Sequence, residues 1–459
     1  MTAKRRSAWR ATRRMQRPRR ATLRIALISE HASPLASLGG VDAGGQNVYV
    51  DKVARQLVER GHEVDVFTRR DDPALPPIVE VQPDLRVVHV GAGPAEFVAK
   101  EEMLPLMPAF ADSMRRFMAE QRRYDLLHAN FFMSGLVGMR LKARLDLPLV
   151  MTFHALGLVR REHQGDSDAF PAERIEIERR IVAMADCLIA ECPQDRSDLR
   201  RLYGASPQRI ATVPCGVDLD EFAPLDRARA RRTLGLGADE FVVLQLGRLV
   251  PRKGIDNVIR AVAAMPERSR VRLLVVGGDA GAVGVQETPE GARLASIAAQ
   301  CGIADRVTFA GHRQRGELAL IYAACDVFVT TPWYEPFGIT PLEAMASARP
   351  VVGSAVGGIQ HTVVDRVTGF LVPPHDPAAL AERLTLLQAA PAVGERMGRA
   401  GRQRVESRFT WQRVADELAT VYAEVSERPA RIGALASSWL PIGRAAASSI
   451  PFLNGSLER

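Results

Sequence analysis

The 459-residue sequence has no apolar run near the ~18 residues that are needed to span a bilayer. Its apolar runs are short, as at 241–244 and 273–276, and such runs are typical of buried strands. The five cysteines, at 187, 192, 215, 301 and 325, include no CxxC pair, so neither a disulfide framework nor a zinc ribbon is indicated. We therefore expect a protein of the reducing cytoplasm.

Acidic residues are absent from positions 1–20, which carry nine Lys and Arg. This segment also lacks an apolar h-region, so it is not a secretory signal. Without these nine, the net charge of +8 becomes 52 basic against 53 acidic residues, which argues against a nucleic-acid binder. We predict that 1–21 is a basic, disordered arm; the alternative is contact with nucleic acid or with anionic lipid at the inner face of the membrane.

Two series of short apolar strands alternate with helical stretches, which predicts two doubly wound α/β domains with parallel sheets. The first series covers 22–215 and the second 240–408, with a linker rich in Asp, Arg, Pro and Gly at 216–239. A helix at 409–428 is expected to return to the first domain, and 429–459 has no assigned role. Ligands of such sheets bind at the carboxyl ends of the strands, so two facing domains suit a two-substrate enzyme.

The segment 330–346 ends a strand and begins a helix near Pro341. Free backbone N–H groups from Gly338 onward form a ready anion site, suited to a diphosphate. Glu335 and Glu343 flank this helix start, and carboxylates there can accept hydrogen bonds from the hydroxyls of a neutral sugar. The alternative for Glu343 is that it only offsets the helix dipole.

Arg248 and Lys253 follow the first strand of the second domain and can reach the same diphosphate, unless they form an ordinary exposed basic turn. His154 ends a strand of the first domain and is either a cleft residue or a core histidine. Asp218-Leu219-Asp220 looks like a DxD metal motif, but its place in the linker favours a turn.

The glycine-rich segment 39–47 does not have the GxGxxG spacing, and the second strand ends in Thr68-Arg69-Arg70 without an acid for a ribose diol. A nicotinamide enzyme would need both features. Gly44 and Gly45 still let the backbone approach a phosphate closely at a helix start. The alternative is a surface turn.

Several of these segments together resemble the family four retaining glycosyltransferases, which have the GT-B fold. The resemblance covers about residues 22–428 and is carried by 44–50, 247–254, 306–311, 335–343 and 356–358, with seven residues separating Glu335 from Glu343. The segments 31–35 and 42–45 most resemble the mycothiol-pathway enzymes that glycosylate inositol phosphate, and also sucrose-phosphate synthases.

The resemblance implies roles for individual residues. Catalytic roles fall to His154, Arg248, Lys253 and Glu335. Donor binding falls to Gly44, Gly45, Arg306, Val307, Phe337, Gly338, Ile339, Thr340 and Glu343, with the backbone of Arg306 and Val307 at the nucleobase. Acceptor binding falls to Asn47, Lys100 and Arg174. Of the four side chains that grip the acceptor phosphate in the mycothiol enzymes, Lys100 and Arg174 match, whereas Phe131 replaces a Tyr and Ala155 a Thr.

We therefore predict a retaining, metal-independent hexosyltransferase without a cofactor. Its co-substrate is a nucleotide diphosphate sugar, expected to be UDP-linked, and its acceptor is a hydroxyl of a small or lipid-linked molecule, phosphorylated or not. Two alternatives stay open: a UDP-sugar 2-epimerase of the same fold, and a non-catalytic binding protein.

Overall fold

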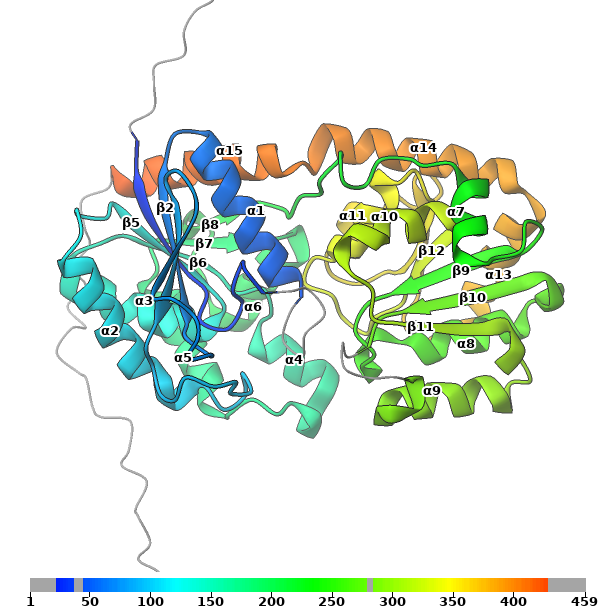
Figure 1. The fold of residues 1–459 in the computed structure, drawn as a ribbon, viewed down its shortest axis with the longest axis horizontal. Coiled ribbons are helices and arrows are strands. Elements are labelled where there is room, and N and C mark those ends of the chain that lie inside the picture. Colours follow the sequence, from blue (N-terminus) through cyan, green and yellow to red (C-terminus); the bar gives the residue numbers. More distant parts are fainter. Residues whose placement is uncertain (1–21, 37–43, 279–283, 428–459) are drawn as a thin grey trace, which may run out of the picture.

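The computed structural model describes residues 22–36, 44–278 and 284–427, which form two α/β lobes side by side (Figure 1). This confirms the predicted fold class of two doubly wound domains. The expectations for the arm 1–21, the tail 429–459 and most of the glycine-rich segment before Gly44 lie outside the described residues. Within the described ranges, no helix is long and apolar enough to cross a membrane.

The first lobe is built on an eight-stranded sheet with the order β3-β4-β2-β1-β5-β6-β7-β8. All its neighbouring pairs are parallel except β3 with β4, which are antiparallel at the edge. The strands are β1 (Arg24–Ile28), β2 (Glu63–Arg69), β3 (Ile78–Gln82), β4 (Leu85–Val90), β5 (Leu126–Asn130), β6 (Leu149–Thr152), β7 (Cys187–Ala190) and β8 (Ile210–Thr212). The helices are α1 (Gly45–Glu59), α2 (Met107–Ala119), α3 (Phe132–Leu145), α4 (Gly157–Gln164), α5 (Glu173–Met184) and α6 (Pro193–Tyr203).

Apolar side chains on both faces of β1 explain why its whole length is buried. Ile25 and Leu27 belong to one core cluster, and Ala26 and Ile28 to the other, because successive side chains of a strand point to opposite faces. Helix α1 buries Val50, Val53, Ala54 and Leu57 and ends before Gly61, whose φ of +84° a glycine adopts easily.

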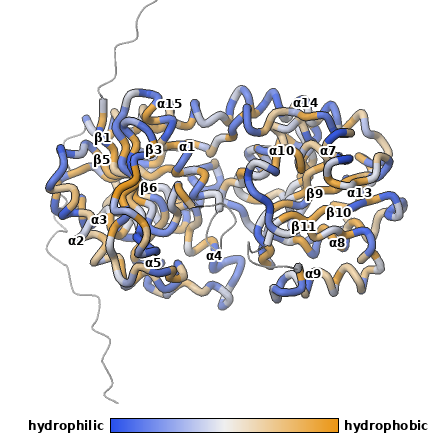
Figure 2. Tube along the Cα trace, viewed as in Figure 1, coloured by the Kyte–Doolittle hydropathy of each residue, from blue (hydrophilic) through white to orange (hydrophobic). Residues whose placement is uncertain are grey.

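The second lobe has a six-stranded parallel sheet with the order β11-β10-β9-β12-β13-β14. Its strands are β9 (Phe241–Leu246), β10 (Val271–Val276), β11 (Val307–Gly311), β12 (Val327–Thr330), β13 (Val351–Ser354) and β14 (Gly369–Val372). Its helices are α7 (Arg227–Leu234), α8 (Ile255–Ala264), α9 (Pro289–Gln300), α10 (Arg315–Ala324), α11 (Ile339–Ala346), α12 (Ile359–Thr362), α13 (Pro377–Ala389) and α14 (Pro391–Arg408). Figure 2 shows the hydrophobic strands running through the middle of both lobes.

The segment 216–239 is not a linker throughout. Its second half forms α7, which packs against α10 through Ala230 and is tied to Asp326 by Arg227 at 2.8 Å and by Arg231 at 2.5 Å. The crossing between the lobes is therefore confined to the residues before α7.

The chain crosses a second time after α14, and helix α15 (Trp411–Ser426) packs against α1 of the first lobe. The two crossings touch, because the Val217 amide donates to the Phe409 carbonyl at 2.8 Å. A Cβ at Gly216 would lie 2.7 Å from the Trp411 nitrogen, so this close approach requires a glycine. In Figure 1, α14 and α15 run along one edge of both lobes.

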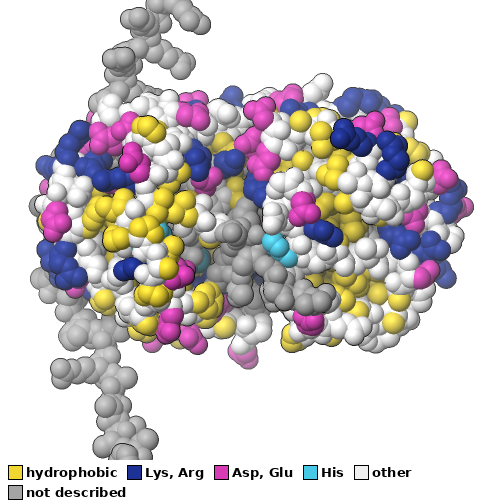
Figure 3. All heavy atoms as spheres, viewed as in Figure 1, with side chains coloured by type: hydrophobic (Ala, Val, Ile, Leu, Met, Phe, Trp, Pro, Cys, Tyr) yellow, Lys and Arg dark blue, Asp and Glu magenta, His cyan; other side chains and the backbone are white. Residues whose placement is uncertain are grey.

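One core cluster continues from β1 and α1 through Phe222 to α10, α11 and α15, so the lobes share apolar packing on the crossing side. On the surface, Figure 3 shows Lys and Arg interspersed with Asp and Glu over both lobes. This fits the near-neutral charge of the chain after its first 20 residues.

Candidate active site

Lys253 and Glu335 meet at the carboxyl ends of the neighbouring strands β9 and β12. Lys253 ends the short turn Pro251–Lys253 after β9, and Glu335 lies on the loop after β12. The Lys253 ammonium donates to a Glu335 carboxylate oxygen. Burial alone would raise the pKa of Glu335, but the charges of Lys253, Arg252 and Arg248 outweigh it and lower that pKa. Burial lowers the pKa of Lys253, although Glu335 opposes this.

Glycines shape the loop that carries Glu335. Gly338 caps α11 with a φ of +88°. A Cβ at Gly357 would lie 1.9 Å from the Glu335 carbonyl oxygen, and the Gly358 amide donates to that oxygen at 3.0 Å. Backbone from 356–358 can therefore pack directly against the loop, which fixes Glu335 just before the helix start.

Glu343 lies one turn into α11 and is 3% exposed. One carboxylate oxygen accepts from Arg315 at 3.1 Å, and the other accepts from the Tyr322 hydroxyl at 2.9 Å. Burial raises the pKa of Glu343, and these two partners offset it only in part. A side chain that only offset the helix dipole would not need buried partners on both oxygens.

His154 follows β6 at the facing edge of the first lobe, with a φ of +57°. Its Nδ1 lies 3.2 Å from the Glu191 carboxylate, and its Nε2 lies 3.0 Å from Oδ1 of Asn130. The Asn130 amide nitrogen donates to the Ile28 carbonyl at 3.4 Å, which orients the amide with its oxygen toward His154. His154 is thus held by two acceptors at the cleft edge and is not packed as an apolar core residue.

Glu191 lies near enough to Glu335 of the other lobe to be affected by its charge. Burial would raise its pKa and the Glu335 charge would too, but the charge and hydrogen bond of His154 and the hydrogen bond of Cys215 lower it. Direct contacts close the junction nearby: the Cys192 thiol donates to the Pro336 carbonyl at 3.3 Å, and the Gln164 amide donates to the Tyr334 hydroxyl at 2.6 Å.

The starts of α1 and α11 face each other across the junction. A Cβ added at Gly45 would lie 3.6 Å from Cδ1 of Ile339, and one at Gly44 would meet nothing within 4 Å. Asn47 supports this turn: its Oδ1 accepts from the Gly44 amide and its Nδ2 donates to the Ser33 carbonyl, each at 2.9 Å. The side-chain amide of Asn47 thus holds the loop through both its oxygen and its nitrogen. A contact of Asn47 with the acceptor substrate stays a prediction.

Arg174 is 1% exposed and lies among the rings of Phe131, Phe132 and Phe170, with its guanidinium carbon 4.6–5.0 Å from their centres. Its Nε donates to Glu178 at 2.8 Å and its Nη2 to the Ala155 carbonyl at 2.5 Å, while its Nη1 has no hydrogen-bond partner.

Lys100 lies on the irregular segment after β4, 3.7 Å from Glu101. The structure places Phe131 directly after β5 and Ala155 just after β6, at the same sheet edge as His154.

Arg306 and Val307 lie at the wrong edge of the sheet for the nucleobase contact that we predicted. They precede and begin β11, and Arg306 is close enough to lower the pKa of Glu240, which precedes β9. Lys253 and Glu335 follow strand ends, and in a parallel sheet the two ends lie on opposite edges. The site edge of the sheet is instead where β11 ends, at Gly311, and His312 and Arg313 follow it there.

A cavity of about 240 Å³ lies between the lobes beside Glu335. Its walls come from both lobes, with Leu156, His163 and Asp195 on one side and Trp333, Val356 and Gln360 on the other.

The segment 218–220, which looked like a DxD metal motif in the sequence, forms a turn. Asp218 Oδ1 accepts hydrogen bonds from the amides of Asp220 and Glu221, each at 3.1 Å.

Comparison with known proteins identifies the family. The Glycosyltransferase Family 4 model matches residues 43–221, and the model of Glycosyl transferases group 1 matches residues 226–404. Curated D-inositol 3-phosphate glycosyltransferases from Actinosynnema mirum and Xylanimonas cellulosilytica are each 40% identical, over 88% and 89% of this chain and 98% of their own length. The chain belongs to the family of glycosyltransferases that these two models and relatives represent.

A solved structure with the same glycosyltransferase fold is the sucrose-phosphate synthase of Thermosynechococcus elongatus. It is 36% identical, with a TM-score of 0.81 over 88% of this chain and 99% of that one. The GT-B fold that the resemblance implied is therefore confirmed, and the chain is a glycosyltransferase. Among residues 22–36, 44–278 and 284–427, no group of three His, Cys, Asp or Glu is placed to hold a metal ion.

Sequence reasoning missed four side chains of the candidate site. Glu191 and Asn130 hold His154, and Arg315 and Tyr322 hold Glu343. Glu191 directly follows β7 and Asn130 ends β5, so the strand-end criterion that selected His154 would also have found both. Nothing in the local sequence marks Arg315 or Tyr322.

Proposed function

We propose that the enzyme transfers a hexose from a UDP-linked donor to a hydroxyl of a small phosphorylated acceptor, without a metal ion and with retention of the anomeric configuration. The observation that carries this proposal is the meeting of the α1 and α11 starts, with Gly45 against Ile339, beside the pair of Lys253 and Glu335. Free amides of two helix starts and a lysine supply positive potential for a diphosphate at one point.

When the donor binds, its diphosphate and its sugar hydroxyls replace the ion pair that Lys253 and Glu335 make with each other. The diphosphate takes over Lys253, with Arg248 near enough to lower the pKa of Glu335. Glu335, which no longer pairs with Lys253, accepts hydrogen bonds from sugar hydroxyls. Glu343 still has acceptor capacity for ribose hydroxyls beside Arg315 and Tyr322, because a carboxylate has about four lone-pair positions.

The acceptor proposal rests on the relatives' names and on Arg174. The inositol-phosphate enzymes and the sucrose-phosphate synthase are each named for a small phosphorylated molecule. Arg174 has a buried nitrogen without a hydrogen-bond partner, and Lys100 supplies a second cation. With Phe131 and Ala155 in place of two hydroxyl donors, we expect weaker phosphate binding than four polar groups would give.

A thermal-shift screen tests the donor first. UDP-glucose, UDP-N-acetylglucosamine, ADP-glucose and GDP-mannose are compared, and a ligand at 100 times its dissociation constant adds about 2.7 kcal/mol to stability. The stabilising donor is then incubated with inositol, inositol 3-phosphate and hexose 6-phosphates. Conversion of the donor sugar without acceptor would instead indicate a 2-epimerase, and binding without turnover on any acceptor would indicate a binding protein.

A further inference from the structure

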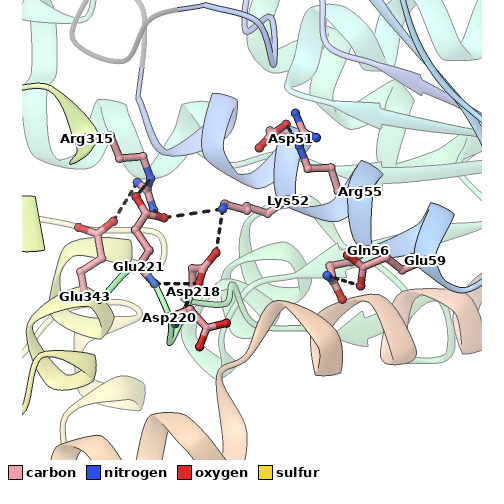
Figure 4. Close-up of polar contacts among 10 residues, drawn as sticks. All are labelled: Asp51, Lys52, Arg55, Gln56, Glu59, Asp218, Asp220, Glu221, Arg315 and Glu343. Atoms are coloured by element: carbon pink, nitrogen blue, oxygen red, sulfur yellow. Dashed lines mark hydrogen bonds and ion pairs between the residues drawn. The ribbon is translucent and has the colours of Figure 1, made fainter. Parts of the chain in front are cut away.

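Five charged side chains form a continuous chain across the lobe junction (Figure 4). Lys52 comes from α1 of the first lobe, Asp218 and Glu221 from the crossing segment, Arg315 from α10 and Glu343 from α11. We call this set the clasp. It lies at the junction of the lobes and begins and ends on the two helices whose starts meet at the proposed donor site.

Ion pairs of 2.6–3.7 Å join the five side chains of the clasp. Lys52 Nζ lies 2.9 Å from Asp218 Oδ2 and 3.7 Å from Glu221 Oε2. Arg315 lies 2.6 Å from Glu221 through Nε and 3.1 Å from Glu343 through Nη1. The chain therefore reaches from the first lobe to a buried carboxylate of the second.

The clasp is shielded from solvent to a degree that ordinary surface ion pairs are not. The side chains of Lys52, Glu221 and Arg315 are 24%, 22% and 20% exposed, and the Arg315 guanidinium lies 5.1 Å from the Phe222 ring centre. Exposed pairs contribute little because water screens them, whereas partly buried pairs are screened much less. The backbone hydrogen bonds to Asp218 further fix the crossing segment in place.

We propose that Lys52 and Arg315 are positioning residues for the donor: through the acids of the crossing segment, they hold the start of α1 in one lobe at a set place relative to Glu343 in the other. Lys52 lies two turns after Gly45, and Glu343 lies one turn after Ile339. The clasp thus fixes the separation of the two helix starts between which the diphosphate and the ribose are bound. This inference rests on the proposed donor site.

The charge arrangement explains why Arg315 is suited to this task. Two cations face three carboxylates, and Glu343 is the most buried of the three. Arg315 bridges Glu221 and Glu343 in a fork that a lysine cannot reproduce, because its planar guanidinium presents several donors at once. A cavity of about 310 Å³ is lined by Asn47, Lys52, Glu221 and Arg315, so the clasp borders a space at the junction of the lobes.

Lys52→Met provides the test, and Arg55→Met provides the matched control. Arg55 lies on the same helix, but its carboxylate partner is Asp51 of α1 itself, at 2.7 Å, and Figure 4 shows this pair apart from the clasp. Titration calorimetry with UDP and with UDP-glucose measures affinity. We expect the dissociation constant of UDP-glucose to rise about fivefold or more in Lys52→Met, as for typical coupling between sites, and to stay at the wild-type value in Arg55→Met.

Arg315→Met tests whether Lys52 acts on Glu343 through Arg315. In that background, Lys52→Met should weaken UDP-glucose binding much less than it does in the wild type, because the connection is already broken. The donor KM should rise while the acceptor KM is unchanged. A Lys52→Met enzyme with a lower melting temperature but an unchanged donor dissociation constant would overturn the clasp alone. A wild-type enzyme that bound neither UDP nor UDP-glucose would overturn the proposed donor site, and the clasp with it.

Discussion

Lys253 and Glu335 are ion-paired with each other at adjacent strand ends, and each opposes the effect of burial on the pKa of the other. The pair joins the turn after β9 to the loop that begins α11. A donor that carries both a diphosphate and a hydroxyl-rich sugar can satisfy both partners at once. A diphosphate alone would satisfy Lys253 and leave Glu335 without a cation.

Lys253→Ala should reduce kcat/KM by about 100- to 1,000-fold, the usual loss when one preorganised electrostatic partner of the transition state is removed. Arg248→Ala should act in the same direction. Arg260→Ala, on the exposed side of α8, is the matched control and should behave as the wild type. Steady-state rates with UDP-glucose and the acceptor found in the screen measure the effect. Near wild-type rates in both test variants would remove these residues from the site.

Donor binding should weaken as the pH falls, and Glu343 should be the cause. Its pKa is raised by burial, so it is protonated before Glu335, whose pKa is lowered. A protonated Glu343 has lost acceptor capacity for ribose hydroxyls. The donor KM is measured from pH 8 down to pH 5 in the wild type and in Glu343→Gln. The variant should have a raised KM that changes less with pH, and equal pH profiles would contradict this assignment.

The strand ends of both lobes could be predicted from the sequence because apolar runs and turn residues are local signals. Those signals placed Lys253, Glu335 and His154 at the correct sheet edges. The prediction for Arg306 and Val307 was wrong because the resemblance pointed to the whole segment 306–311. In the parallel sheet, the beginning of that segment lies at the edge away from Lys253 and Glu335.

The partners of these residues could not be predicted in the same way. Arg315 reaches Glu343 from a helix 28 positions away, and Glu191 reaches His154 from the next strand of the sheet. Such contacts depend on strand order and helix packing. The predicted linker 216–239 is too long for a similar reason. Helix α7 has few apolar residues, so only its contacts with Asp326 show that it belongs to the second lobe.

Asp65 should contribute strongly to the stability of the first lobe. It is paired with Arg24 at 3.2 Å and Arg86 at 2.7 Å, and it accepts from the Tyr124 hydroxyl. Asp65→Asn leaves two arginines without their carboxylate and should cost about 3 kcal/mol, as for other broken buried pairs. Urea denaturation followed by tryptophan fluorescence and circular dichroism measures the change, with Asp112→Asn on the surface as the control.

The same residue predicts a pH dependence of stability. Burial would raise the pKa of Asp65, but its hydrogen bonds from Arg86 and Tyr124 and the arginine charges lower it. Its contribution is therefore complete above the unfolded-state pKa of about 3.9 and is lost as the pH falls through the lower folded-state value. The urea midpoint of the wild type should drop toward that of Asp65→Asn below about pH 4. A constant difference between the two proteins would contradict this.

Activity should survive treatment with EDTA. Lys253, Arg248 and the amides at the starts of α1 and α11 can together offset the diphosphate charge, which is the task a divalent cation would otherwise perform. The rate is compared before and after chelation, and again after addition of Mg²⁺ or Mn²⁺. A loss of activity that either cation restored would show that these groups are insufficient.

The product should keep the α configuration of the donor. Inversion requires a general base opposite the leaving group, within about 2.6–3.2 Å of the acceptor hydroxyl. His154 is the obvious candidate, but its Nδ1 faces the Glu191 carboxylate and its Nε2 faces the Asn130 amide oxygen. Each ring nitrogen of His154 is thus already engaged by a polar partner of its own lobe.

Two other carboxylates near the junction are also engaged. Glu335 lies against Lys253, and Glu191 accepts from His154 and, at 3.1 Å, from the Cys215 thiol. Attack from the leaving-group face remains, with the departing phosphate oxygen taking the proton of the acceptor while Lys253 and the helix-start amides stabilise its charge. Proton NMR of the fresh product from an α-linked donor measures the anomeric coupling. A β coupling would show that a base acts from the opposite face, and His154→Gln would then be expected to abolish transfer.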